Sequence, residues 1–437
     1  MSYNFLLISW GTSGNLNPLL TAARLLRQRG HRIRVMADPA MRDEVAAADF
    51  EFVTWRRAPT GREADPVDFT DIIDCFRRAL IDPAAAYAAD VRDEIGRAAT
   101  DAVLTIDILF GAALGAEAAG VPYAMLSPHV SLRPLAGVPP ASTGMSAPRT
   151  PEERTEVAAA SGQFAEVFNA LLPGFNDACA RFGVTRLPHM LDIFDRPARV
   201  LLAMSQAFDF KADWLPDNVR YVGPLLDQPS WSGPWRAPWS AGSNRPRVLI
   251  ACSTGAQGQG ELFQRVIHAM GQLDIEAVAT AGPNLDIDMF HAPDNVRLLR
   301  SAPHDTVMSE VSLVISQGGH GTVNRALIHA LPLLVLPMGR DQGDNAARVE
   351  AKGAGLRLSP DASETEIASA AARLILDPQF GFCARRLGNA IKIDIDSTTL
   401  VREMEAVAAM GCGGRMAAES AARARSARRA NRRQPAA

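Results

Sequence analysis

The sequence has few cysteines and no apolar run long enough to cross a membrane. The five cysteines are scattered and no two of them have CxxC spacing. This argues against a disulfide framework and predicts reduced thiols in a cytoplasmic protein. Because no stretch of about 18 uncharged apolar residues occurs, we expect no transmembrane helix and no stable membrane insertion. The cysteines are Cys75, Cys179, Cys252, Cys383 and Cys412.

An excess of one charge is also missing. The chain has 45 Lys and Arg against 48 Asp and Glu, a formal net charge of -3, so we expect no nucleic-acid partner. Residues 411–437 are the exception, with seven arginines and the single acid Glu419. We predict a disordered basic tail there, and a role of this tail at nucleic acid or membrane is the alternative. The opening MSYNFLLISW lacks a preceding positive charge, which favours a first strand over a signal peptide.

Strand-like and helix-like segments alternate through the first half of the chain. A strand over residues 5–9, a glycine-bearing loop over 11–17, a helix over 18–29 and a strand over 32–37 form one βαβ unit, which should join parallel strands by a right-handed crossover. The first half also contains predicted strands at 102–106, 123–126 and 200–204, a helix at 111–120, a long loop at 131–150, and helices within 151–182.

The same alternation restarts after a break. Residues 225–245 carry Pro, Ser, Gly and three tryptophans without periodicity, which predicts a linker whose tryptophans pack on a domain. The fold class is therefore α/β, with two Rossmann-like domains (1–224 and 246–410) facing across a cleft and ligands at the carboxyl ends of the strands. Predicted strands of the second half are 247–251, 276–281, 296–299, 313–316 and 333–337.

The strongest chemical signal is the turn QGGHGT, from Gln317 to Thr322, between a predicted strand and a helix. Glycines let the backbone approach a ligand closely. The unpaired N–H groups and the dipole of the helix start attract an anion such as a diphosphate. Thr322 can cap the helix or bond a phosphate oxygen. Taken alone, this sequence is also compatible with a simple tight turn.

The wider pattern is more specific. GGHGT, an apolar helix, LPLLVLP, Asp341-Gln342 and then NA follow one another. This order resembles the donor-binding signature of the UDP-glycosyltransferase family (glycosyltransferase family 1), which includes bacterial natural-product and macrolide-type enzymes. GNLNP at 14–18 and LPDNVRYVGP at 215–224 match the same family. The resemblance implies the GT-B fold, an N-terminal acceptor domain, a C-terminal donor domain, inversion, and no metal or other cofactor.

The resemblance also assigns partners and residues. It implies transfer from a dTDP- or UDP-sugar to a hydroxyl of a small hydrophobic acceptor, and we leave a homodimer open. A carboxylate and an amide together suit vicinal sugar hydroxyls, because one accepts and the other also donates. The donor-binding residues so implied are Thr254 for the diphosphate, Gln317, Gly318, Gly319, His320, Gly321 and Thr322 for the phosphate turn, and Asp341 and Gln342 for the sugar.

Three positions depart from the family pattern. Gln317 replaces a histidine and brings no charge. Arg325 stands where plant members carry a ribose-binding Glu, which favours a dTDP-sugar. Asn15 stands where the catalytic base should be, and an amide cannot take a proton at neutral pH.

The missing base directs attention to Asp107. This residue follows the strand at 102–106, ahead of a helix ending in Gly-Val-Pro, and it matches the family's base-supporting Asp. We predict that Asp107 acts as the base directly or through a water, because burial at a strand end raises the pKa of a carboxyl. Asn15 would then orient the acceptor. The alternative is that Asp107 only caps the following helix.

Other interpretations remain open. Asn15 also fits a catalytically silent homologue that binds a nucleotide-sugar or a partner enzyme. C- or N-glycosylation and a GT-B epimerase are further alternatives. The DxD sequences at 286–288 and 394–396 are interpreted as structural, and the eight histidines show no metal-ligand spacing. His129, after a strand end, either lines the acceptor site or is an ordinary satisfied or exposed histidine.

Overall fold

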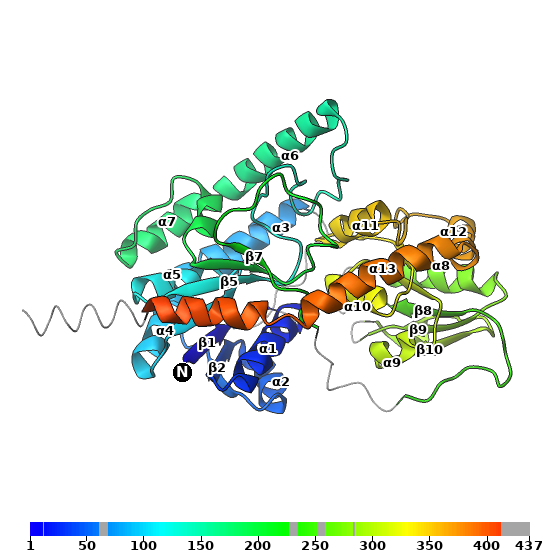
Figure 1. The fold of residues 1–437 in the computed structure, drawn as a ribbon, viewed down its shortest axis with the longest axis horizontal. Helices are drawn as coiled ribbons and strands as arrows, with labels where there is room; N and C mark the ends of the chain where they lie inside the picture. Colours follow the sequence, from blue (N-terminus) through cyan, green and yellow to red (C-terminus); the bar gives the residue numbers. More distant parts are fainter. Residues whose placement is uncertain (12, 61–68, 227–234, 252–257, 283–284, 412–437) are drawn as a thin grey trace, which may run out of the picture.

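The protein consists of two α/β units that lie side by side (Figure 1). The computed structural model describes residues 1–11, 13–60, 69–226, 235–251, 258–282 and 285–411. Each unit is built on one sheet, and every strand pair in both sheets is parallel. Parallel neighbours need crossover connections, usually helices, which explains the alternation in the sequence. The predicted fold class, two Rossmann-like domains, is confirmed.

The N-terminal sheet has seven strands in the order β3-β2-β1-β4-β5-β6-β7. The order changes direction between β1 and β4, where Phe5 pairs with Ala102 and Ile8 with Thr105. Ligands of such sheets bind outside the carboxyl ends of the strands at this switch point. The strands are β1 Asn4–Ile8, β2 Arg32–Ala37, β3 Glu51–Thr54, β4 Ala102–Ile106, β5 Tyr123–Ser127, β6 Arg199–Leu202 and β7 Val219–Tyr221.

Helices cover both faces of this sheet, so its central strands are buried on both sides. All five residues of β4 and of β5 are buried, as expected for near-continuous apolar runs in a parallel sheet. The helical elements are α1 Ser13–Gln28, η1 Pro39–Met41, α2 Arg42–Ala47, α3 Phe69–Phe76, η2 Arg77–Ile81, α4 Ala84–Arg97, α5 Phe110–Ala118, α6 Pro151–Asn169, α7 Leu172–Arg181 and η3 Met190–Asp195.

The C-terminal sheet repeats this plan with six strands in the order β10-β9-β8-β11-β12-β13. Its switch point lies between β8 and β11. The strands are β8 Arg247–Ala251, β9 Glu276–Thr280, β10 Val296–Leu299, β11 Leu313–Ser316, β12 Leu333–Val335 and β13 Gly355–Arg357. The helical elements are α8 Gly260–Gly271, η4 Ile287–Met289, α9 His304–Met308, α10 His320–Ile328, α11 Gln342–Ala351, α12 Glu364–Leu376 and α13 Pro378–Ile395.

The end of the chain crosses back to the N-terminal unit. A last helix over residues 399–411 follows α13 and lies beside α1 and the first strands (Figure 1). Its apolar face is buried in the same cluster as Phe5 and Leu7 of β1. The last helix of the predicted C-terminal domain, 246–410, therefore packs on the N-terminal unit instead. The buried residues of this helix are Leu400, Val401, Met404, Val407 and Ala408.

Two further segments test the local predictions. Residues 13–17 were expected to be loop, but they form the start of α1, which continues through Pro18. In the linker, the indole N–H groups of Trp235 and Trp239 donate to Glu310 at 3.1 and 2.5 Å. These two tryptophans thus pack on the C-terminal unit, as predicted. Trp231 and the tail 412–437 lie outside the described residues.

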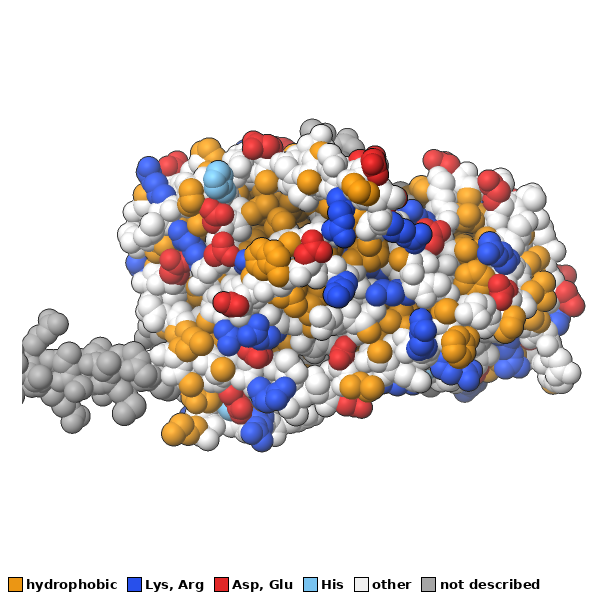
Figure 2. Space-filling model, turned by 45° about the horizontal axis from the view of Figure 1, so that its top comes forward, with side chains coloured by type: hydrophobic (Ala, Val, Ile, Leu, Met, Phe, Trp, Pro, Cys, Tyr) orange, Lys and Arg blue, Asp and Glu red, His pale blue; other side chains and the backbone are white. Residues whose placement is uncertain are grey.

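Acidic and basic side chains both occur over both units on the molecular surface that Figure 2 draws. None of the helices in the described ranges is both long and apolar enough to span a membrane. The charged side chains on the face in Figure 2 form no large patch of a single charge. This agrees with the near balance of acidic and basic residues in the sequence.

Candidate active site

On the N-terminal side, three polar side chains meet at the ends of β4 and β5. Asp107 directly follows β4 and is fully buried. Its Oδ2 accepts a hydrogen bond from the Ser127 hydroxyl at 2.5 Å. Its Oδ1 lies 3.2 Å from Nε2 of His129. Because β4 and β5 are neighbouring parallel strands, their carboxyl ends bring the carboxylate and the imidazole together.

His129 is held in its charged form by this arrangement. Burial by itself lowers the pKa of His129, but the charge of Asp107 and the bond to it outweigh burial and raise the pKa to about 9. Nδ1 donates to the carbonyl of Val130 at 2.9 Å. The side chain keeps 22% of its surface exposed, so it is the part of the pair that a ligand can reach. The sequence alone left the role of His129 open between an acceptor-site residue and an ordinary histidine, although its place just after a strand end pointed to the site.

The two predicted catalytic residues have distinct surroundings. Asp107 does not cap α5, since the N-cap of that helix is Leu109 without a side-chain bond; the capping alternative is wrong. A direct contact between Asp107 and an acceptor does not fit the complete burial of this carboxylate. Asn15 lies in α1, and its Nδ2 donates to the carbonyl of Trp10 at 2.9 Å, which ties the amide to the loop after β1.

On the C-terminal side, the glycine turn follows β11 and opens α10. Gly318 has φ +94°, and a Cβ there would stand 2.7 Å from Val335 Cγ1, so only glycine fits. A Cβ built on Gly319 or Gly321 meets nothing within 4 Å, and the helix start is therefore open to a ligand. The N-cap is Gly319 without a side-chain bond; the suggestion that Thr322 caps α10 is wrong.

Two side chains of this turn point elsewhere. Gln317 is buried, and its Nε2 lies 3.3 Å from the sulfur of Met338. His320 reaches the N-terminal unit, where its Nε2 lies 3.1 Å from the carbonyl oxygen of Ala203. Burial lowers the pKa of His320, and its Nδ1 lies 3.3 Å from Oδ1 of Asn345, so both ring nitrogens face oxygen atoms. The turn therefore offers a ligand its backbone at residues 319–321, while His320 contributes to the interface between the units.

The predicted sugar-binding pair stands at the start of α11, next to the glycine turn. Asp341 is the N-cap of α11, and its Oδ2 accepts from Asn345 Nδ2 at 3.1 Å. The same Nδ2 donates to the Gly318 carbonyl at 2.9 Å, so Asn345, which the sequence pattern included only as part of its NA motif, joins the turn to Asp341. Gln342 is buried and accepts from the Met338 amide at 2.8 Å.

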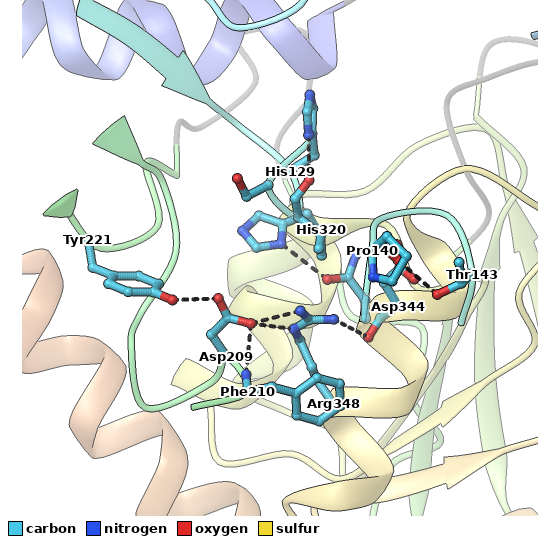
Figure 3. Close-up of polar contacts among 12 residues, drawn as sticks. His129, Pro140, Thr143, Asp209, Phe210, Tyr221, His320, Asp344 and Arg348 are labelled. Carbon is cyan, nitrogen blue, oxygen red and sulfur yellow. Dashed lines mark hydrogen bonds and ion pairs between the residues drawn. The ribbon is translucent and has the colours of Figure 1, made fainter. Parts of the chain in front are cut away.

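The two sides come close enough to interact electrostatically. The charge of Asp341, from the C-terminal unit, is among the causes that raise the pKa of His129 in the N-terminal unit. His320 bridges the same gap through Ala203, and Figure 3 shows His129 and His320 near each other. The carboxyl ends of the two sheets therefore meet at one place.

The remaining candidates have structural partners or cannot be placed. Thr254 lies outside the described residues. Arg325 pairs with Asp305 of α9. In the two DxD sequences, Asp286 accepts the backbone N–H of Asp288 within η4, and Asp394 accepts the Ser205 hydroxyl at 2.5 Å. Within the described ranges, no group of three or more His, Cys, Asp or Glu side chains is arranged to hold a metal ion.

Comparison with known proteins points to one family. Residues 264–413 match the family described as "Erythromycin biosynthesis protein CIII-like, C-terminal domain". Over 408 residues the chain is 28% identical to 4'-demethylrebeccamycin synthase of Lentzea aerocolonigenes, covering 86% of this chain and 92% of that protein. These similarities support a natural-product glycosyltransferase of glycosyltransferase family 1. The chain is a glycosyltransferase.

Solved structures agree with the fold of this glycosyltransferase. The glycotransferase of kitacinnamycin superposes with a TM-score of 0.75 at 20% identity, over 93% of this chain and 99% of that one. Spinosyn rhamnosyltransferase SpnG, complexed with thymidine diphosphate, superposes with a TM-score of 0.64 at 20% identity, over 92% and 100%. At these identities the likeness establishes the GT-B fold.

Proposed function

We propose that this glycosyltransferase moves a sugar from a dTDP- or UDP-sugar to a hydroxyl of a small hydrophobic acceptor, with inversion and without a metal. The observation that carries the proposal is the meeting of two strand-end sites. One is the Asp107–His129 pair at the ends of β4 and β5. The other is Asp341 with the open start of α10, and the charge of Asp341 reaches His129.

The donor half of the proposal rests on the backbone of the glycine turn. Unpaired N–H groups at a helix start, together with the dipole, stabilise an anion by ~0.3–1 kcal/mol, and by up to ~2 kcal/mol when partly buried. The space over Gly319 and Gly321 suits a diphosphate there. Thymidine diphosphate in the related rhamnosyltransferase structure and Arg325 in place of Glu favour dTDP. Contact of Thr254 with the diphosphate stays a prediction.

On the acceptor side, we propose that His129 accepts the hydroxyl proton. The acceptor oxygen forms a bond to the anomeric carbon as the bond from that carbon to the diphosphate breaks, and the hydroxyl proton must leave. Nε2 of His129 faces Asp107, so Nδ1 is the nitrogen left for the acceptor, in exchange for its bond to Val130. Only the neutral imidazole can accept this proton, and Asp107 then stabilises the imidazolium that forms.

A catalytically silent, nucleotide-sugar-binding homologue is the second candidate. It is favoured by the amide at Asn15, which cannot act as a base, and by the burial of Asp107. C- and N-glycosylation remain alternatives to transfer onto a hydroxyl, because the donor site does not determine which atom of the acceptor attacks the sugar.

The deciding experiment measures transfer and hydrolysis separately. dTDP-glucose and UDP-glucose are incubated with phenols, alkanols and an indole, with and without EDTA, and the products are assigned by NMR. An O-glycoside of inverted anomeric configuration, formed equally with EDTA, is expected. Nucleotide binding without transfer or donor hydrolysis would instead support the silent homologue, and a C- or N-glycoside would replace the hydroxyl assignment.

A further inference from the structure

The loop that begins near His129 is attached at its other end to the donor helix α11. Within this loop, the backbone N–H groups of Ser142 and Gly144 donate to the carboxylate of Asp344 at 2.6 and 2.8 Å. Both residues have positive φ, 66° and 62°, and the Thr143 hydroxyl closes the turn by donating to the Pro140 carbonyl at 2.8 Å. Asp344 is buried. One carboxylate of the C-terminal unit thus holds a strained turn of the N-terminal unit.

The backbones of the two units touch at this point. A Cβ on Gly343 would lie 3.3 Å from the Cα of Gly144, and one on Gly144 would lie 3.4 Å from the Cα of Gly343, so a side chain at either position would press on the opposite backbone. Arg357 of β13 also donates to the Gly144 carbonyl at 2.6 Å. Figure 3 shows Asp344 facing the turn formed by Pro140 and Thr143. The contact is therefore close, polar and built from both sides.

The position of Asp344 links the two halves of the site. Asp344 lies in the first turn of α11, three residues after Asp341. The segment it binds runs from His129 through buried apolar residues to the turn at 142–144. We propose that Asp344 is a positioning residue that sets the separation between the His129–Asp107 pair and the donor-sugar residue Asp341. This inference rests on the proposed function, in which these groups act on the two substrates.

The physical reason is that the rate of sugar transfer depends steeply on the relative positions of the reacting groups. Acceptor and donor are held by different units, and misplacement of a reacting group by ~1 Å can lower a rate by about 10²-fold. Nucleotide affinity depends on the glycine turn and does not need the 142–144 turn. Loss of the Asp344 contact should therefore lower kcat without lowering affinity for the nucleotide.

Two variants test this from opposite sides. Asp344→Asn leaves one acceptor oxygen for two N–H donors, and Gly343→Val wedges the backbones apart while keeping the carboxylate. Each should lower kcat for transfer by about tenfold or more, with the Kd of dTDP and UDP unchanged within about twofold in calorimetry. Because both act on one contact, the double variant should be little worse than the poorer single variant.

Asp394→Asn is the matched control, since Asp394 also bonds across the two units, to Ser205, but from α13. It should keep kcat close to wild type at a similar shift in Tm. Unchanged kcat in both test variants would overturn the proposal. It would also be overturned if kcat and nucleotide affinity fell together, in proportion to the loss of Tm, in all three variants.

If the proposed function is wrong, the wild-type enzyme transfers no sugar, and this outcome is distinct from a failure of the positioning role. The contact itself is then read by hydrogen exchange of the amides at 142 and 144, which Asp344→Asn should accelerate. Unchanged exchange at these amides would overturn the inference irrespective of turnover.

Discussion

Arg348 of α11 forms a buried ion pair with Asp209 of the N-terminal unit, through Nε at 2.8 Å and Nη2 at 2.7 Å (Figure 3). The Tyr221 hydroxyl donates to the other oxygen of Asp209 at 2.7 Å. One helical turn separates Arg348 from Asp344, so α11 is tied to the N-terminal unit at two places. The helix α11 is therefore held in a fixed relation to the N-terminal unit.

Removal of one partner of this pair should be costly. Asp209→Ala leaves Arg348 buried and unpaired, and breaking a buried pair in this way costs about 3–5 kcal/mol. Tyr221→Phe, which removes one hydrogen bond to the same carboxylate, should cost about 1–3 kcal/mol. Urea unfolding at neutral pH measures both variants. Equal free energies of unfolding for Asp209→Ala and wild type would show that the ion pair does not hold the units together.

The His129–Asp107 pair predicts how stability depends on pH. Because the pKa of His129 is raised from 6.5 to about 9, the folded state favours the protonated ring. This stabilisation is fully present below pH about 6.5 and is lost as pH rises through about 9. Tm measured from pH 6 to 10 should fall more steeply for wild type than for His129→Gln, and parallel curves would contradict the assigned ion pair.

The same pair predicts the pH dependence of catalysis, with the opposite sign. Since neutral His129 accepts the proton, kcat should rise with pH toward about 9. His129→Gln and Asp107→Asn should each lower kcat by ~10²–10⁴-fold and abolish this rise, while calorimetry finds the dTDP affinity unchanged. Asn15→His should preserve or raise turnover. Wild-type rates in Asp107→Asn would end the base assignment. Activity that appears only in Asn15→His would identify the natural chain as silent.

Asp344 should make activity and stability respond oppositely to acid. Burial raises the pKa of Asp344 to about 6, although bonds from Gly144 and Ser142 and the charge of Arg348 oppose this, and Asp341 adds to it. Protonation weakens the hold on the 142–144 turn, so kcat should fall as pH drops through about 6. Over the same range folding gains stability from this group, because the folded state binds its proton more tightly.

The test is the difference in Tm between wild type and Asp344→Asn from pH 7 to 4, measured together with kcat. The charged groups near the contact include Arg348, Asp341 and Arg357. Asp394→Asn, which removes a carboxylate outside this contact, serves as the control for a general charge effect. A Tm difference independent of pH would contradict titration of Asp344 in this range.

The open start of α10 predicts a substitution that blocks ligand without harming the fold. A side chain at Gly321 meets no protein atom near its Cβ, so Gly321→Leu should leave Tm unchanged while it occupies the space of the diphosphate. Loss of the helix-start contacts should weaken dTDP binding by about tenfold or more. Asp341→Ala should impair use of the intact nucleotide-sugar and spare free dTDP. Unchanged nucleotide affinity in Gly321→Leu would refute the donor assignment.

Several features of this glycosyltransferase followed from the sequence because their causes are local. Buried parallel strands are continuous apolar runs, so β4, β5, β8 and β11 could be predicted, and with them the place of Asp107 at a strand end. The glycine turn before α10 was also predictable, since the backbone at Gly318 excludes every side chain.

Other features depend on contacts between residues far apart in the chain. Asp107 meets His129 only because β4 and β5 become neighbours. His320 contacts Ala203 of the other unit, and Asp344 binds Ser142 some 200 residues earlier. The helix at 399–411 has an apolar face that either unit could cover, and packing assigns it to β1. Local patterns define which face or group needs a partner, whereas only the tertiary structure decides which partner reaches it.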